Sequence, residues 1–454
     1  MPRPKELDGR ATDAAGESGR RGRFIPWAVF LISALVYAAT AARDVVSLDV
    51  RTAYIASWRI TTAGVPWIEG LTLPELDHPL RHVWVLEAAN GHEVIGRSPG
   101  VVASGLPAFW LFGSDAPTNL PGALTAALMT ALAVTLLFLA LRTRLAQRNA
   151  VLCTFVFGFA TPAWSVAANG LWPHTVTVLG ICGLAWSSAR ERWWLAGLFG
   201  GVIAWGRLHA AVVVAAVGLI LGVGRREPGI TWRIGLLSLA SLVPMIVWTR
   251  WMYGSWNPMA SYDTAVFTGY AEENRFSVVN HLGFWISPDS GFLVWTPVIL
   301  VMLPALVRSW RSLPEWARAL TIGGLGYTVV QLTLNRFSGG DGFYGYRLGL
   351  ELLACAAPAF AFASAALGPV ARRLVGPVVA LQAAAIFVGA SRDSYFVASD
   401  RVWEDNAFVI ALRENPVGGI CVVAVSVLLG VIAQRIWAQS DSTERGTVSS
   451  HSVP

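Results

Sequence analysis

The sequence predicts an all-α polytopic membrane protein with about twelve transmembrane helices and large loops on one side of the membrane. Hydrophobic residues make up 54% of the 454 positions and charged residues only 14%, whereas soluble domains are nearer a quarter charged. Apolar runs recur along the chain, several of them nearer roughly 15 to 18 residues than the ideal length of about 20. Arginines gather in alternate connections between these runs. A chain of this composition cannot bury its apolar surface in one aqueous globule.

The predicted helices follow one another with short connections after the first loop. The apolar runs fall at 25–42, 119–141, 150–168, 172–188, 193–207, 209–224, 233–250, 291–308, 319–334, 348–367, 374–390 and 417–436. We therefore expect one multi-span domain over residues 25–437. A basic, disordered cytoplasmic tail is expected at 1–24 and a second disordered cytoplasmic tail at 438–454.

Arginine placement orients the predicted helices, because short cytoplasmic loops carry an excess of Lys and Arg. With the N-terminus inside, alternate connections hold Arg142, Arg144, Arg148, Arg190, Arg192, Arg225, Arg226, Arg233, Arg308, Arg311, Arg318, Arg372 and Arg373. Both termini are therefore expected in the cytoplasm, with the chain in the plasma membrane. The outer face receives loops 43–118, 251–290, 335–347 and 391–416. The formal charge of +6 reflects this orientation rather than nucleic-acid binding.

Asp49 is the strongest candidate for chemistry. It lies in ARDVVSLDVRTAY at the head of loop 43–118, together with Asp44 and Tyr54. A carboxylate at a dry interface can act as a general base toward a hydroxyl. The alternative is that Asp44 or Asp49 caps the amphipathic helix expected over 50–61. The two roles are compatible.

The same loop holds three histidines and two glutamates without the spacing of a tight metal site. The group is His78, Arg81, His82, Glu87, His92, Glu93 and Arg97. No HExxH pattern occurs and the four cysteines stand singly, so no metal ligands are assigned and metal dependence stays open. A solvated polar loop with some substrate contacts is the favoured interpretation. Arg97 differs because it precedes Ser-Pro-Gly and an expected short helix near 101–112, a turn that suits a phosphate.

Two further outer turns bring polar side chains to the membrane face. His174 lies in AANGLWPHTV, and Arg207 and His209 lie in AWGRLHAAV. An arginine at membrane depth is costly and indicates function by default, with a carboxylate or a lipid phosphate as its partner. The alternatives are a packed aromatic turn for His174 and an interfacial turn for Arg207 with His209.

A glycine-rich segment, SGGDGFYGYRLGLEL, precedes the tenth apolar run and carries Asp341, Tyr344, Tyr346 and Arg347. Its glycines let the backbone approach a ligand closely, so we interpret it as a headgroup or pyrophosphate site. The alternative is a flexible loop with an arginine snorkelling at a helix start. In loop 251–290, Tyr262 lies among aromatic and small residues of the kind that bind sugar rings.

Taken in order, these segments resemble the GT-C superfamily of polytopic glycosyltransferases, and look closest to the dolichyl-phosphate-mannose-protein mannosyltransferase and lipid A aminoarabinose transferase families of bacteria. The resemblance covers about residues 25 to 370. It rests on GRSPGVVASGLPAFWLFG, ATPAWSVAANGLWPHTV, AWGRLHAAV, WMYGSWNPMASY, GFWISPDSGFLVWTPVILVMLPAL and SGGDGFYGYRLGLELLACAAP. The sequence departs from the family pattern in Val50 after the acidic residue, in Arg97 and Ser98 before Pro-Gly, and in Tyr346 before arginine.

The resemblance implies an inverting transferase that moves a hexosyl or pentosyl group from a polyprenyl-phosphate sugar to a hydroxyl acceptor (a glycan, lipid or protein) at the outer face of the bilayer. Asp49 would be the base, with Asp44 as the other catalytic candidate. Arg207, Arg347 and Arg97 would bind the donor phosphate. The remaining substrate-binding candidates are Tyr54, His78, His82, His174, His209, Tyr262, Asp341, Tyr344 and Tyr346.

Two other functions are compatible with the same composition. A transporter or flippase of polyprenyl-linked glycans would also need about twelve spans and intramembrane arginines. Such proteins often show paired repeats with broken helices, and no repeat is visible here. The third possibility is a non-catalytic scaffold on a GT-C-like fold.

Overall fold

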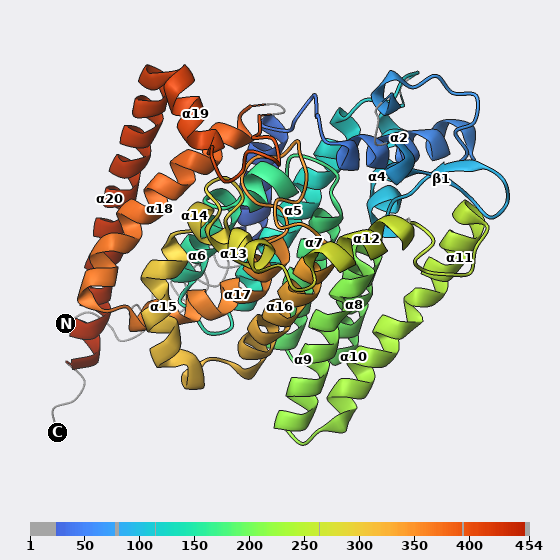
Figure 1. Cartoon of the computed structure of the whole chain (residues 1–454). Coiled ribbons are helices and arrows are strands. Elements are labelled where there is room, and N and C mark those ends of the chain that lie inside the picture. Colours follow the sequence, from blue (N-terminus) through green and yellow to red (C-terminus); the bar gives the residue numbers. More distant parts are fainter. Residues whose placement is uncertain (1–23, 78–80, 114, 263, 393–394, 450–454) are drawn as a thin grey trace, which may run out of the picture.

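The computed structural model describes residues 24–77, 81–113, 115–262, 264–392 and 395–449, and this part of the chain is mostly helical (Figure 1). The predicted all-α class is confirmed. In chain order the helices are Phe24–Ala39, α2 (Leu48–Ala63), η1 (Pro74–Leu76), α3 (Arg81–Trp84), α4 (Pro99–Phe112), α5 (Leu120–Leu141), α6 (Gln147–Phe159), η2 (Ala163–Ala167), α7 (Pro173–Ala189), α8 (Trp193–Gly206), η3 (Leu208–Ala210), α9 (Ala211–Gly224), α10 (Pro228–Ala240), α11 (Leu242–Tyr253), α12 (Thr264–Asn274), α13 (Val278–Ile286), α14 (Phe292–Trp295), α15 (Val298–Ser309), η4 (Trp310–Ser312), α16 (Glu315–Leu334), α17 (Leu350–Ala363), η5 (Ser364–Ala366), α18 (Pro369–Ala390), α19 (Ala407–Glu414) and α20 (Pro416–Ser449).

Proline and glycine set many of these helix ends. Helices α4, α7, α10 and α18 begin at a proline, whose missing N–H and fixed φ suit the first helical position. Helices α2 and α11 end at Gly64 and Gly254, both in the left-handed conformation that closes a helix with little strain in glycine. The chain is therefore divided into many short helices rather than a few long ones.

Three helical stretches in the described residues are long and apolar enough to cross a membrane: Leu120–Leu141, Pro228–Tyr253 and Pro369–Ala390. A bent pair, Ala407–Glu414 with Pro416–Ile432, makes up to four if it forms one span. Shorter apolar helices are Phe24–Ala39, Pro99–Phe112, Trp193–Gly206, Leu208–Gly224 and Leu350–Ala366. The count of twelve spans is not confirmed, because most expected spans are too short or are interrupted by turns, and it stays a prediction.

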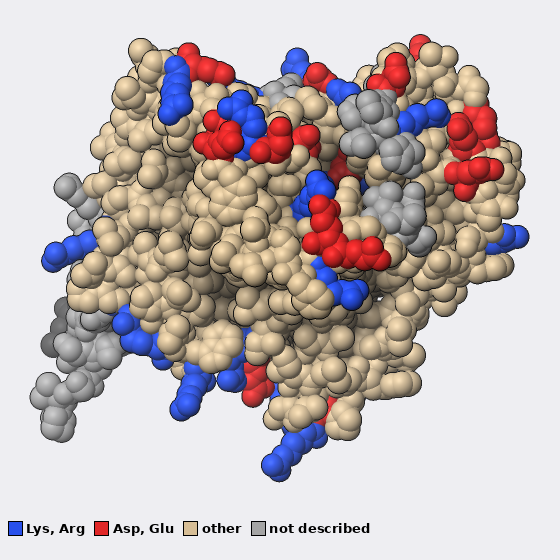
Figure 2. Space-filling model, in the orientation of Figure 1, with Lys and Arg blue, Asp and Glu red and all other residues tan. Residues whose placement is uncertain are grey.

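The outer surface of the helices is apolar over a broad zone. Large side chains such as Leu219, Trp232, Leu239 and Val243 point outward from α9, α10 and α11. In Figure 2 the charged side chains gather toward the upper and lower ends of the molecule, with a wide uncharged region between them. Apolar patches of this extent do not face water in soluble proteins, so the protein is a membrane protein.

The centre of the bundle is formed by α7, which packs between α5 and α8 and also contacts α17. A compact cap of α2, η1, α4 and one β-hairpin lies at the upper right in Figure 1. The hairpin pairs β1 (Val85–Glu87) with β2 (Glu93–Ile95) antiparallel, in the register Val85↔Ile95. The helices expected near 50–61 and 101–112 are α2 and α4. At the other end of the chain, α20 continues through the expected tail as far as Ser449.

Candidate active site

Asp49 lies in the first turn of α2, where its carboxylate meets two arginines. Its Oδ1 accepts hydrogen bonds from Arg97 Nη2 and from Trp84 Nε1, the latter at 2.9 Å. Its Oδ2 accepts a hydrogen bond from Arg347 Nη1. The N-cap residue Ser47 makes no side-chain cap bond. The Asp49 carboxylate is therefore engaged by side chains from three segments of the chain.

The hairpin places Trp84 and Arg97 side by side at its open end. The Gly96 amide donates to the Trp84 carbonyl at 2.7 Å, and the Arg97 guanidinium lies 5.8 Å from the Trp84 ring centroid. The Tyr253 hydroxyl accepts from the Arg97 amide at 3.2 Å and donates to the Arg97 carbonyl at 2.9 Å. Arg97 Nε donates to Thr52 Oγ1 at 2.7 Å. Arg97 is thus held at its backbone and at its side chain.

The glycine-rich loop brings Arg347 to the same carboxylate. Gly342 has φ of +84°, and a Cβ there would lie 2.5 Å from the Ser47 amide nitrogen. Only glycine permits both this conformation and this close approach to the segment that leads into α2. The Arg347 guanidinium stacks on Trp172 and Phe343, at 5.1 and 5.4 Å from the ring centroids. The loop is therefore packed against the site rather than loose.

The three charged side chains are largely shielded from solvent. Exposed fractions are 16% for Asp49, 10% for Arg97 and 14% for Arg347. Burial alone would raise the pKa of Asp49, but the Arg347 and Arg97 guanidiniums outweigh it and hold that pKa well below its ordinary value. Asp49 is consequently ionised at neutral pH in the unliganded protein.

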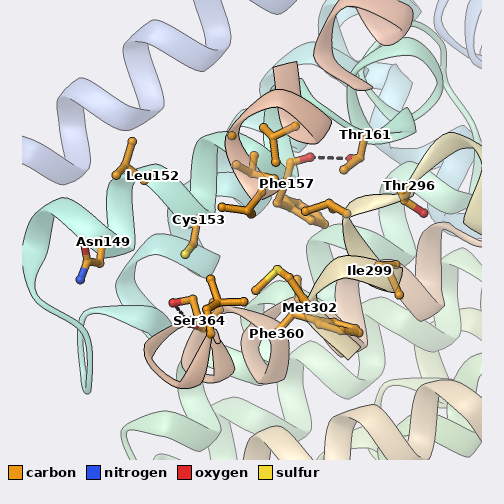
Figure 3. A pocket seen from close by; sticks show the side chains of 18 of the residues that line it. Asn149, Leu152, Cys153, Phe157, Thr161, Thr296, Ile299, Met302, Phe360 and Ser364 are labelled. Carbon is orange, nitrogen blue, oxygen red and sulfur yellow. Dashed lines mark hydrogen bonds between the residues drawn. The ribbon is translucent and has the colours of Figure 1, made fainter. Parts of the chain in front are cut away.

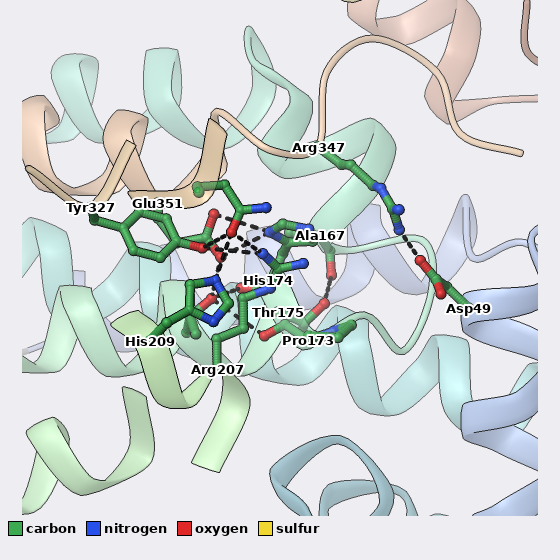
Figure 4. Close-up of polar contacts among 12 residues, drawn as sticks. Asp49, Ala167, Pro173, His174, Thr175, Arg207, His209, Tyr327, Arg347 and Glu351 are labelled. Carbon is green, nitrogen blue, oxygen red and sulfur yellow. Dashed lines mark hydrogen bonds and ion pairs between the residues drawn. The ribbon is translucent and has the colours of Figure 1, made fainter. Parts of the chain in front are cut away.

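A second polar cluster is buried among α7, α16 and α17 (Figure 4). His174 Nδ1 lies 2.8 Å from Glu351 Oε1, and Thr177 Oγ1 donates to the same oxygen at 2.7 Å. All three side chains are buried. His174 Nε2 has no partner among the described residues. Because buried polar atoms are normally paired, this nitrogen is available to a further group.

Arg207 and His209 join the same cluster through α16. Arg207 Nη1 donates to Gln331 Oε1 at 2.7 Å and to Tyr327 Oη at 3.1 Å. His209 Nε2 lies 2.6 Å from Gln331 Oε1, and its ring stacks on Tyr327 with the centroids 5.4 Å apart. Arg207 is therefore held by neutral side chains, with the Glu351 charge nearby.

Electrostatic interactions connect the two clusters. His174 lies within range of the Arg207 and Arg347 charges, and Tyr262 lies within range of Arg97 and Arg207. The three arginines predicted to bind phosphate thus belong to two neighbouring clusters, which together form one polar region. With the histidines counted as neutral, three positive and two negative side chains leave the region with one net positive charge: Arg97, Arg207, Arg347, Asp49 and Glu351.

Other predicted site residues lie outside these clusters. Asp44 is exposed and its Oδ1 accepts from the Val45 amide at 2.8 Å. Asp341 is also exposed and its Oδ1 accepts from the Ser399 amide at 2.7 Å. Tyr54 is buried in α2. Neither aspartate is brought to the Asp49 carboxylate: Asp44 bonds within its own segment, and Asp341 joins the glycine-rich loop to the segment that holds Ser399.

Two predicted tyrosines also lie outside the clusters. Tyr346 is fully buried against Phe292, with ring centroids 5.0 Å apart. Tyr344 packs on Trp295 and lines a small cavity of about 30 Å³ behind Phe343. His78 and the side chain of His82 lie outside the described residues.

Several residues of the two clusters had no assigned role in the sequence. They are Thr52, Trp84, Thr177, Tyr327 and Gln331, whereas Tyr253 and Glu351 lie in segments that the sequence singles out as candidate substrate sites. Glu351 carried a usable signal, because a carboxylate inside an apolar run is costly unless it is paired. Trp84 and Thr52 carried none, since their role depends only on where the hairpin and α2 meet.

The polar site offers arginines rather than metal ligands. Among the residues the structure describes, no three His, Cys, Asp or Glu side chains converge on a common point. In the first loop, His92 instead pairs with Glu69 at the surface, Nδ1 to Oε1 at 2.7 Å, and stacks on Trp67.

An apolar cavity of about 200 Å³ lies elsewhere in the bundle, lined by parts of α6, α15, α17, α18 and α20 (Figure 3). Its lining includes Phe157, Met302, Leu353 and Phe360. The α17 residues of this lining lie on the helix face opposite Glu351. The cavity is therefore separate from the polar site.

Comparison with solved structures identifies the fold. ArnT from Cupriavidus metallidurans, solved bound to undecaprenyl phosphate, matches with a TM-score of 0.50 and 16% identity, over 90% of this chain and 76% of that one. The oligosaccharyltransferase AglB from Archaeoglobus fulgidus, solved with an inhibitory peptide and a dolichol-phosphate, matches with a TM-score of 0.45 and 12% identity. This match covers 89% of this chain and 56% of AglB. No protein-family model and no curated protein matches the sequence.

ArnT and AglB are GT-C superfamily glycosyltransferases. The chain shares the fold of ArnT, and the resemblance to the GT-C superfamily is confirmed at the level of the fold.

Proposed function

We propose that the protein is an inverting membrane glycosyltransferase that moves a sugar from a polyprenyl-phosphate donor to a hydroxyl acceptor, with Asp49 as the general base. The observation that carries this proposal is the shielded Asp49 carboxylate held between Arg97 and Arg347. It combines in one place a group that can take a proton and two groups that can bind a phosphate. The fold shared with ArnT, which was solved with undecaprenyl phosphate, supports the same donor class.

The charge of the site suits this donor. The donor links its sugar to the lipid through a phosphodiester, which carries one negative charge. The surplus positive charge of the two clusters would balance it, and a largely water-free setting strengthens that attraction. Arg347 offers the phosphate a further N–H group for a hydrogen bond, because its Nε is buried without a partner among the described residues. Arg207 would approach from the second cluster.

The transfer follows from these groups. An Asp49 oxygen takes the proton of the acceptor hydroxyl as the acceptor oxygen bonds to the anomeric carbon of the donor sugar. The bond from that carbon to the phosphate oxygen breaks with inversion, and polyprenyl phosphate leaves with the electron pair. The arginines stabilise the second negative charge that the phosphate gains. Holding the two substrates in line supplies much of the remaining acceleration.

The sugar would lie between the two clusters. Tyr262 is an aromatic residue within range of arginines of both. His174 offers an unpaired Nε2, which can accept from a sugar hydroxyl. His209 and Tyr327 add a stacked pair of rings. The transferred group would be a hexosyl or pentosyl group, and the acceptor would be a hydroxyl of a glycan, lipid or protein.

The proposed topology has about twelve spans, both termini in the cytoplasm and Asp49 at the outer face of the plasma membrane. The lower edge of the face in Figure 2 is mainly blue, which supports a cytoplasmic position for that end. The Asp49 cap lies at the opposite end (Figure 1).

The proposal is tested with the full chain in proteoliposomes supplied with a panel of undecaprenyl-phosphate sugars and an envelope extract as acceptor. A glycosyltransferase consumes one of these donors, releases undecaprenyl phosphate and labels the acceptor. Movement of an intact donor across the bilayer without cleavage would instead establish the transporter function. Failure of every donor to be cleaved or moved would leave the scaffold role.

A further inference from the structure

The two arginines that hold Asp49 are anchored very differently. Arg97 donates to Thr52 as well as to Asp49, and Tyr253 fixes its backbone. Among the described residues, the Arg347 side chain hydrogen-bonds only to Asp49. Its other contacts are the rings of Trp172 and Phe343, which attract the cation without fixing it through a hydrogen bond. Arg347 is therefore the arginine that can change partners.

The two oxygens of Asp49 are also unequal. Oδ1 accepts from Trp84 and Arg97, whereas in the part of the chain that the structure describes Oδ2 accepts from Arg347 alone. Withdrawal of Arg347 would therefore free Oδ2 and leave the carboxylate oriented through Oδ1. No such selective release is available through Arg97, because Trp84 shares its oxygen.

We propose that Arg347 is a switch that moves from Asp49 Oδ2 to the donor phosphate, so that the base is released only after the donor has bound. This inference rests on the proposed function and assigns Oδ2 as the oxygen that takes the proton. A phosphate competes well for a guanidinium, since Arg–phosphate contacts are bidentate and charge-assisted.

The consequence is an ordered reaction. With both arginines in place, the carboxylate is a weak base because its pKa is held low. In the described residues, the charged groups that act on it are Arg347 and Arg97. Transfer of Arg347 to the donor removes one positive neighbour and adds a negative phosphate, and both changes raise the pKa. An acceptor that arrives first therefore meets an inactive base.

The release of Asp49 is measured with dicyclohexylcarbodiimide, which modifies protonated carboxyl groups in apolar settings. The full chain in detergent is treated at mildly acidic pH with and without undecaprenyl monophosphate, and the Asp49 peptide is quantified by mass spectrometry. Binding of the same lipid is followed separately by tryptophan fluorescence. Labelling of Asp49 should rise severalfold with the lipid, about tenfold for each unit by which its pKa increases.

Variants separate the switch from general effects. Arg347→Gln should label strongly without lipid and show a smaller rise with lipid than the wild type, and Arg347→Met, which also removes the charge, is the second variant if glutamine prevents folding. Arg336→Gln is the matched control, since Arg336 is exposed in the same loop and pairs with Glu273. It should behave as the wild type.

Each remaining outcome is decisive. Lipid that binds the wild type without changing Asp49 labelling overturns the switch and leaves the proposed function standing. An Arg347 variant that folds but labels no more than wild type shows that Arg347 does not control Asp49, and also overturns it. Failure of the wild type to bind undecaprenyl monophosphate overturns the proposed function and this inference together.

Discussion

Replacement of Asp49 by Asn should abolish sugar transfer while sparing donor binding. Asparagine keeps the size of the side chain and can still accept from Trp84, but it cannot take a proton from the acceptor. A positioned general base contributes about 10²- to 10⁴-fold, which is about 3 to 5 kcal/mol of barrier. The loss should lie toward the upper end of that range, because the other carboxylate described in the two clusters is already engaged. The oxygens of Glu351 are engaged by His174 and Thr177.

The same substitution has the opposite effect on the phosphate site. Without the carboxylate, Arg97 and Arg347 keep their positive charges and lose a competitor for the donor. Undecaprenyl phosphate should therefore bind Asp49→Asn at least as tightly as the wild type, although the unpaired arginines lower the stability of the free protein. Transfer is assayed as release of undecaprenyl phosphate, and binding by tryptophan fluorescence.

Asp405→Asn is the matched control, since Asp405 is similarly shielded, with 19% of its side chain exposed, and pairs with Arg401 outside the site. It should retain transfer. The assignment of Asp49 as the base is refuted if Asp49→Asn keeps more than about a tenth of the activity, a loss far below that expected of a general base. Parallel loss of transfer and lipid binding would instead make Asp49 a scaffold for the arginines.

Three further predictions address the surroundings of Asp49. Arg347→Gln should weaken undecaprenyl phosphate binding about 10- to 150-fold, which corresponds to the loss of one charge-assisted hydrogen bond of about 1.5 to 3 kcal/mol. Arg336→Gln should not weaken it. Equal affinities of the two variants in titration would contradict the phosphate role of Arg347. Because the pKa of Asp49 is lowered in the folded protein, its ionised form stabilises the fold above the unfolded-state pKa of about 3.9 and loses this effect as pH falls further. The thermal-stability advantage of donor-free wild type over Asp49→Asn should thus be constant from neutral pH to about pH 5 and shrink below about pH 4, and an advantage that grows on acidification would be inconsistent with it. Gly342→Ala should abolish transfer because its Cβ would lie 2.5 Å from the Ser47 amide nitrogen. Gly91 has nearly the same φ of +83° but open space around it, so Gly91→Ala should cost only about 1 kcal/mol of backbone strain. Similar activity of the two variants would show that close packing at Gly342 is unimportant.

Local patterns were sufficient for the coarse fold and for part of the site. Apolar composition predicted the helical membrane class, and a charged residue next to apolar sequence marked Asp49, Arg97, Arg207 and Arg347. Each signal depends on the cost of removing one charged residue from water, and the charge and its apolar neighbours can both be read from the sequence. The count of spans was less accessible, because packing inside a bundle allows short or broken helices that length criteria do not recognise.

The partners within the site were not accessible in the same way. Asp341 and Tyr346 have the chemistry of site residues and lie in the same segment as Arg347, yet Asp341 accepts from the Ser399 amide and Tyr346 packs on Phe292. Which side chains of one loop face a common point depends on the positive-φ glycines and on what they pack against.

By itself, the sequence determined that this protein is helical and apolar. It also determined that a few arginines and one aspartate near the N-terminus are the charged residues whose removal from water costs free energy. The tertiary structure alone decided that Arg97 and Arg347 meet on Asp49, and that Arg207 belongs to a second cluster with Tyr327 and Gln331. The reason is physical. Solvation cost belongs to a single residue, whereas a carboxylate shared by two arginines requires three segments of the chain to converge within hydrogen-bonding distance.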